Sequence, residues 1–238
     1  MLYAETICAR ISVLLVGRTL ELRTILAAFA VLMMFFGSGA RAQSTSEGAG
    51  ASAGAGANPD VGSEAGPVKG GHELEIWSGG GPSIAGGIPN IGVWNAGMRY
   101  GWVLTGPHGP GFLRGRFETG VDVAPIFWVF QPGGTAYGIA IVPSVLKWDF
   151  ATSGRVVPYL DLDGSVLLTS RDTPPHLSHD NFTPSIAMGV HFLRHKYNWS
   201  AEFRFLHISD AGLTPHNPGI NTVEVRMGVG LFTHSKSK

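Results

Sequence analysis

The chain has one cysteine, few lysines and no net charge. The cysteine, Cys8, lies near the N-terminus, so the residues that follow offer neither disulfide bonds nor thiol chemistry. Basic and acidic residues number 17 each, which excludes the strongly basic surface that nucleic-acid-binding proteins present. We therefore expect a fold held by packing and hydrogen bonding alone, and no nucleic acid among its partners.

An apolar run long enough for a typical membrane-spanning helix is also missing from the sequence. The apolar run of residues 25–36 is shorter than the roughly 20 residues that such a helix needs. Arginines precede the run, and the small-x-small sequence Ala40-Arg41-Ala42 follows it, as in a signal peptide with its cleavage site. We expect residues 1–42 to be a signal peptide that directs export, with an uncleaved anchor as the alternative.

The next segment is poor in large apolar side chains. Residues 43–71 consist mainly of Gly, Ala and Ser, which bury too little apolar surface to offset the entropy of ordering. We interpret them as a flexible leader, residues 72–233 as one folded domain and residues 234–238 as a C-terminal tail.

Helical periodicity is scarce after residue 72, where extended runs alternate with Gly, Pro, Asn and Asp. Most runs reach the ~9–11 residues that a tilted strand needs to cross a bilayer. The eight runs are residues 72–79, 93–103, 112–125, 136–148, 156–169, 182–193, 197–209 and 221–232.

Apolar and charged positions alternate within the runs. In the seventh run, Phe203 and Phe205 share one face, while Glu202 and Arg204 share the other. A soluble β-sandwich, which we keep as the alternative, also alternates. Here, however, the polar faces carry charges of both signs and almost no lysine, as in a narrow salt-bridged lumen. The sequence therefore predicts an all-β fold: an eight-stranded antiparallel transmembrane β-barrel of the outer membrane.

His207 and Ser209 lie at the end of the seventh run, on the face of Phe203 and Phe205. In an extended chain, residues i and i+2 point to the same side, so the imidazole and the hydroxyl can lie together. Nucleophilic catalysis by a hydroxyl group requires at least an adjacent base that can take its proton. Polar groups on a lipid-facing wall are costly, and attack on an acyl chain in the leaflet would explain them. The simpler alternative is that these residues are polar because the strand ends there, near the lipid headgroups.

The residues from Glu202 to Gly219 read Phe-x-Phe-x-His-x-Ser-x-Ala-Gly and continue to an Asn-Pro-Gly turn. With the signal peptide and the barrel pattern, the chain resembles the lipid A 3-O-deacylase (PagL) family. The resemblance implies an outer-membrane esterase without a cofactor, acting on the acyl chains of lipid A in lipopolysaccharide. It also implies that Ser209 is the nucleophile and His207 the general base, with Asn217 and Gly212 in supporting roles near the oxyanion.

The chain departs from the family where the family has its catalytic acid, because Asn221 occupies that position. Glu224 is close in sequence but has the opposite parity, so we expect it in the lumen, paired with Arg204. Asp210 could supply a carboxylate only if the strand ends before it. We therefore assign Asn221 to the third catalytic position, where its carbonyl could hold the imidazole.

Two non-enzymatic interpretations stay open, the first of them because of Asn221. The first is a non-catalytic outer-membrane barrel with a structural, adhesion or resistance role. The second is a small pore, which the bulky, mixed-charge side chains expected in the lumen disfavour. The sequence also leaves open whether the barrel forms a homodimer.

Two further stretches are chemically suggestive. His176 and His179 share a loop with Asp172 and Asp180, but the four lack the spacing of a metal site, and we expect a polar surface loop and no metal. The Gly-Gly-Gly-Pro stretch of residues 79–82 has no helix after it, so we interpret it as a turn rather than a phosphate-binding loop.

Overall fold

The computed structural model describes residues 66–216 and 218–233. The predicted signal peptide, residues 43–65 of the predicted leader, Asn217 and the tail of residues 234–238 lie outside the described residues, so their assignments remain predictions. Within the described part, no helix is long and apolar enough to span a membrane.

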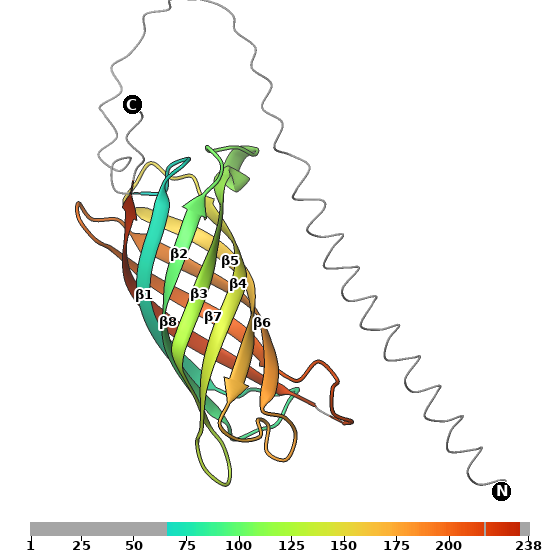
Figure 1. The fold of residues 1–238 in the computed structure, drawn as a ribbon. Coiled ribbons are helices and arrows are strands. Elements are labelled where there is room, and N and C mark those ends of the chain that lie inside the picture. Colours follow the sequence, from blue (N-terminus) through green and yellow to red (C-terminus); the bar gives the residue numbers. More distant parts are fainter. Residues whose placement is uncertain (1–65, 217, 234–238) are drawn as a thin grey trace, which may run out of the picture. The chain divides into compact units, whose positions relative to one another are not determined.

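Antiparallel strands close into a barrel in which each strand pairs with the next and β1 pairs with β8 (Figure 1). A short 3-10 helix, η1 (Gly111–Leu113), lies between the second and third strands. The strands are β1 (His72–Pro82), β2 (Gly92–Val103), β3 (Gly115–Phe130), β4 (Ala136–Phe150), β5 (Val156–Thr169), β6 (Asp180–Phe192), β7 (Asn198–Ile208) and β8 (Ile220–Thr233). The predicted eight-stranded antiparallel β-barrel is confirmed.

The glycine-rich stretch of residues 79–82 was predicted to be a turn, and that prediction is wrong. These residues are the last four of β1. Their backbones pair with β2 along the whole stretch and with β8 as far as Gly80, so hydrogen bonds on both sides keep the glycines extended.

β3 begins later and ends later than expected. The 3-10 helix η1 precedes it, and the strand continues past Pro125 to Phe130. The register of β3 against β4 shifts between Ala124 and Phe127. Such a bulge accommodates a proline, which has no N–H to donate to the neighbouring strand.

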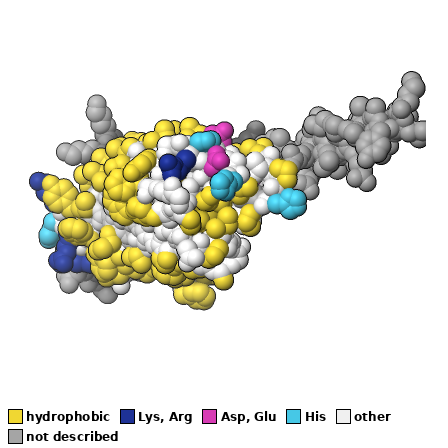
Figure 2. Space-filling model, turned by 90° about the horizontal axis from the view of Figure 1, so that it is seen from below, with side chains coloured by type: hydrophobic (Ala, Val, Ile, Leu, Met, Phe, Trp, Pro, Cys, Tyr) yellow, Lys and Arg dark blue, Asp and Glu magenta, His cyan; other side chains and the backbone are white. Residues whose placement is uncertain are grey.

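The alternating faces lie as the sequence predicts. On β7, Phe203 and Phe205 are exposed on the outer wall, whereas Glu202 and Arg204 are buried inside. Large apolar side chains cover much of the outer wall, and Figure 2 shows them around the rim of the molecule seen from below. An apolar surface of this extent is costly in water and favourable in hydrocarbon. The wall therefore has the character of a membrane-spanning barrel.

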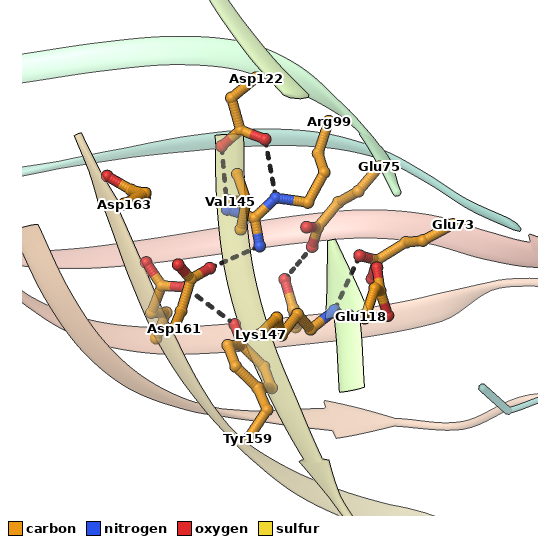
Figure 3. Close-up of polar contacts among 12 residues, drawn as sticks. Glu73, Glu75, Arg99, Glu118, Asp122, Val145, Lys147, Tyr159, Asp161 and Asp163 are labelled. Atoms are coloured by element: carbon orange, nitrogen blue, oxygen red, sulfur yellow. Dashed lines mark hydrogen bonds and ion pairs between the residues drawn. The ribbon is translucent and has the colours of Figure 1, made fainter. Parts of the chain in front are cut away.

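The lumen holds a network of buried ion pairs (Figure 3). Arg99 Nε lies 2.7 Å from Asp122 Oδ1, and Arg99 Nη1 lies 2.6 Å from Asp161 Oδ2. Lys147 Nζ lies 2.7 Å from Glu73 Oε2. Because these pairs join β2 to β5 and β4 to β1, side chains meet across the barrel and occupy its interior. This filling further disfavours the small-pore interpretation.

One end of the lumen is apolar rather than charged. Leu206, Ile208 and Ile220 point inward where β7 and β8 meet their connecting loop, and none of them is more than 3% exposed. They pack in a buried hydrophobic cluster that includes Trp77 and Phe127. The expected salt-bridged lumen is therefore correct for only part of the barrel, and the end of the β7–β8 hairpin rests on packed apolar side chains.

Replacing Lys147 with Met should destabilise the barrel. The substitution leaves the buried carboxylates of Glu73, Glu118 and Asp149 without the ammonium that lies within 4 Å of each. We expect the free energy of unfolding to fall by about 3–5 kcal/mol, because breaking a buried ion pair leaves uncompensated charge. Urea unfolding in lipid vesicles, followed by tryptophan fluorescence, measures this change.

The control is Lys69→Met, because Lys69 is exposed and belongs to no ion pair of the described residues. Its effect should stay below about 0.5 kcal/mol, as is usual for surface substitutions. Equal stability of the Lys147→Met variant and the wild type would contradict a structural role for the network.

Candidate functional site

His207 and Asn221 face each other at the end of the β7–β8 hairpin. They are register partners, and the imidazole Nδ1 lies 2.6 Å from the amide oxygen Oδ1 of Asn221. A carbonyl oxygen only accepts hydrogen bonds, so the ring proton belongs on Nδ1, which donates to Oδ1. The other ring nitrogen, Nε2, then has a free lone pair and can accept a proton. Both side chains are partly exposed on the outer wall.

Gly219 forms the surface against which the imidazole lies. A Cβ at this position would be 2.4 Å from His207 Cε1 and 2.9 Å from Nε2, too close for the ring to stay where it is. Gly219 also has a φ of +68°, in the left-handed region that favours glycine. The close approach and the backbone conformation together explain why glycine occupies this position of the motif.

The loop of residues 83–91, between β1 and β2, supports Asn221. The N–H of Ile84 donates to the carbonyl oxygen of Asn221 at 2.8 Å. Gly86 lies so close that a Cβ there would be 3.0 Å from Asn221 Nδ2. This support has no direct signal in the sequence, because the contact exists only once β1 has paired with β8. A pair of adjacent glycines in the loop is the one local sign of a close backbone approach.

Ser209 follows directly after the end of β7. Its backbone exchanges two hydrogen bonds with Phe182 of β6, 2.7 and 3.1 Å long, which extends the strand pairing beyond His207. The side chain is partly exposed, like that of His207 two residues earlier. The structure shows no hydrogen bond from the Ser209 hydroxyl to any residue that it describes. Contacts between a nucleophile and its base are often long without substrate, so the geometry is compatible with the predicted pair.

Asp210 is buried and holds the turn that follows Ser209. Its carboxylate accepts the backbone N–H groups of Gly212, at 3.0 Å, and Thr214, at 2.8 Å, as well as the Thr214 hydroxyl. These bonds commit the carboxylate to its own turn rather than to His207. The Gly212 N–H, expected near an oxyanion, donates to Asp210 here, and its oxyanion role remains a prediction.

Glu224 faces the lumen, as its parity predicts, and has an exposed fraction of 0%. Its partners are Asn95 Nδ2, at 2.9 Å, and the Thr222 hydroxyl, at 3.2 Å. The expected pairing with Arg204 is wrong. Although Arg204 lies opposite Glu224 in the register, its guanidinium pairs with Glu202 on its own strand and with carboxylates of β5.

The histidines of the loop between β5 and β6 do not converge on a common point. His179 Nε2 lies 3.1 Å from Asp172 Oδ1, and its Nδ1 lies 3.0 Å from the carbonyl oxygen of Thr169. Among the described residues, no group of three or more His, Cys, Asp or Glu side chains could hold a metal ion. The loop is ordered by its own hydrogen bonds.

A groove of about 840 Å³ lies on the outer wall along the second half of β1. Its floor lacks large side chains, because the outward positions of this half are Ser78, Gly80 and Pro82. Trp94 and Trp128 line one side, and the β8 residues Val225 and Met227 line the other. Asn221 is outward on β8, two outward positions before Val225, so the groove begins close to the His207–Asn221 pair.

Comparisons with known proteins point to one family. A family model described as lipid A 3-O-deacylase (PagL) matches residues 94–230. Among solved structures, the chain is similar to the outer membrane enzyme PagL, with 18% identity and a TM-score of 0.50, over 65% of this chain and 97% of that chain. It is also similar to the outer membrane protein OprG from Pseudomonas aeruginosa, with 10% identity and a TM-score of 0.44, over 71% of this chain and 99% of that chain. No curated protein matches the sequence.

Gly219→Ala should move the imidazole and break its bond to Asn221, because the new methyl group would occupy the position of the ring edge. Gly212→Ala is a matched control: Gly212 also has a positive φ, +82°, but a Cβ there meets no atom within 4 Å. Both variants carry the backbone cost of roughly 1–2 kcal/mol. ¹⁵N NMR of the histidine ring nitrogens should show an altered His207 signal in the first variant alone. Unchanged His207 signals in both variants would contradict the packing described.

Proposed function

The chain belongs to the lipid A 3-O-deacylase (PagL) family and lies in the outer membrane, and on that premise we propose that it hydrolyses the ester of the 3-linked acyl chain of lipid A. In this proposal Ser209 is the nucleophile and His207 the general base. The observation that carries it is the 2.6 Å contact between His207 Nδ1 and Asn221 Oδ1 on the outer wall. In the neutral ring, that contact places the proton on Nδ1, so that Nε2 can act as the base on the lipid-facing side.

The position of the pair along the barrel supports a substrate in the outer leaflet. β1 begins and β8 ends at one end of the barrel, and His207 and Asn221 lie at the other (Figure 1). That second end carries the loops 83–91, 131–135, 170–179 and 209–219. Outer-membrane barrels have short periplasmic turns and longer extracellular loops. Two of the three connections at the first end, residues 151–155 and 193–197, are shorter than three of these four loops, so we take the end with the pair as the extracellular one.

The proposed reaction has two stages. Ser209 Oγ forms a bond to the ester carbonyl carbon while its proton passes to His207 Nε2. The tetrahedral intermediate then collapses: the bond to the sugar 3-oxygen breaks, and that oxygen takes the proton from Nε2. Water attacks the acyl-serine in the same way, which releases the fatty acid and restores the Ser209 hydroxyl.

The groove along β1 provides a place for the acyl chain. Its walls and floor are apolar or small, and it opens toward lipid rather than water. Between Ser78 and Pro82 the strand rises about 13 Å, enough for a medium-length chain to lie along it. A chain in this groove would leave its ester carbonyl near Asn221 and His207.

A non-catalytic barrel is the second candidate, and Asn221 is the observation that favours it. An amide can orient the imidazole through Oδ1, but it has no charge with which to stabilise the imidazolium that forms during attack. We therefore expect ester hydrolysis to be slower than it would be with a carboxylate at this position. A barrel with a structural, adhesion or resistance role would instead keep His207 and Ser209 for reasons unrelated to ester hydrolysis.

Expression in a host with complete lipid A should separate these candidates. Mass spectrometry of the extracted lipid A should show the loss of one hydroxyacyl chain when the wild type is expressed, and fully acylated lipid A when Ser209→Ala is expressed. Heat-modifiable gel mobility confirms that both proteins are folded. Identical lipid A from the two strains would remove the enzymatic proposal and leave the non-catalytic barrel.

Asn221→Asp should raise the deacylation rate, because a carboxylate of the same shape can both orient the imidazole and stabilise its charge. The gain is bounded by the factor of about 10⁴ that the reverse exchange can cost in a serine triad. Asn221→Leu, which keeps the size but lacks the acceptor, should abolish the activity. Rates are compared on purified lipid A in mixed micelles. A rate for Asn221→Asp at or below that of the wild type would contradict a triad role for this position.

A further inference from the structure

Basic side chains gather at the end of the barrel opposite His207. We call Lys69, Arg114, Arg155, Arg194 and Lys196 the turn cations, because they lie in the segment before β1 and in the three turns of that end. All five are exposed. The described segments that carry them, residues 66–71, 104–114, 151–155 and 193–197, contain no Asp or Glu.

The two ends of the barrel thus differ in charge. Among the loops at the end with His207, the described residues include one cation, Arg171, together with Asp172 and Asp210. Figure 2, which views the molecule from that end, shows few Lys and Arg side chains among many uncharged ones. The positive charge outside the lumen is therefore concentrated at the terminus end.

The turn cations have no carboxylate partner among the described residues. The described ion pairs belong to the lumen, where Arg99 and Lys147 are neutralised by nearby acids, and to the loop between β5 and β6. None involves a turn cation. Their charge is therefore free to act on a partner outside the barrel.

Exposed apolar side chains lie beside these cations. In the turn between β2 and β3, Phe112 is 88% exposed and Leu113 48% exposed, directly before Arg114. In the turn between β6 and β7, Lys196 Nζ lies 5.3 Å from the centre of the Tyr197 ring. Trp199, the second residue of β7, is 54% exposed. Aromatic and apolar side chains next to cations are typical of the boundary between lipid headgroups and acyl chains.

We infer that the turn cations bind the anionic headgroups of phospholipids in the periplasmic leaflet, with Phe112 and Leu113 inserted among the acyl chains. The charge of the surface complements a phosphate-bearing headgroup without a balancing ammonium, such as phosphatidylglycerol. An anionic cell-wall polymer would meet the same cations but would gain nothing from Phe112. This binding surface is independent of the proposed esterase site, which lies at the other end of the barrel.

The experiment uses protein purified from outer membranes in detergent micelles that contain equal amounts of phosphatidylglycerol and phosphatidylcholine. Native mass spectrometry counts the phospholipids that remain bound. The wild type should retain phosphatidylglycerol in preference to phosphatidylcholine, and Arg194→Gln/Lys196→Gln should lower that preference by roughly fivefold or more at low salt. Arg171→Gln, a cation at the other end, is the matched control and should leave the preference unchanged.

A second pair of variants separates charge from insertion. Arg114→Gln/Arg155→Gln should lower the preference in the same way, and replaces the first pair if that pair fails to fold. Phe112→Ser should weaken retention of both lipids while the preference for phosphatidylglycerol stays. The inference is overturned if the wild type shows no preference for phosphatidylglycerol, or if Arg171→Gln lowers the preference as much as the turn-cation variants do. It is also overturned if the turn-cation variants retain phospholipid as the wild type does but lose binding to purified peptidoglycan, because the cations would then serve the cell-wall polymer.

Discussion

The pairing of β1 with β8 closes the sheet, and the other features of the molecule depend on that closure. Once no edge is left, every strand side chain faces either the lumen or the surroundings of the barrel. The same pairing brings the loop 83–91 against Asn221, although the two are far apart in the sequence. It also lays the glycine-rich half of β1 beside β8, which creates the groove on the side of β8 away from His207.

The interior makes the outer wall rigid. Charged side chains meet across much of the lumen, and the hydrophobic cluster fills the end beneath the hairpin. Leu206 and Ile208, on either side of His207 in the sequence, are both buried in that cluster. The imidazole therefore projects from a backbone that is fixed from inside, and Gly219 and Asn221 fix the ring from outside. Rigid support of this kind reduces the reorganisation that a reacting group must undergo.

The strand number, the faces and the outward pairing of His207 with Asn221 could be predicted from the sequence. A closed barrel offers a strand only two environments, so a period of two residues carries nearly all the information about which way a side chain points. The same rule excluded Glu224 from the site, and the structure agrees.

What could not be predicted depends on partners that the sequence does not show. A glycine-rich stretch remains a strand when both neighbours supply hydrogen bonds, as they do for Gly79 and Gly80, and Pro125 continues a strand when a bulge absorbs it. The direction of the Asp210 carboxylate depends on the conformation of its own turn. The support that Gly86 gives Asn221 depends on barrel closure. Each of these is a contact between segments or within an irregular loop, where periodicity carries no signal.

His207 and Asn221 open sideways from the wall, and this direction determines how the protein meets a lipid. A substrate in the same leaflet arrives by lateral diffusion in two dimensions. The encounter rate is then set by the mole fraction of that lipid among its neighbours and not by its amount in the aqueous volume. Diluting the substrate with inert lipid therefore lowers the encounter rate, as diluting a soluble substrate with water does for an enzyme in solution.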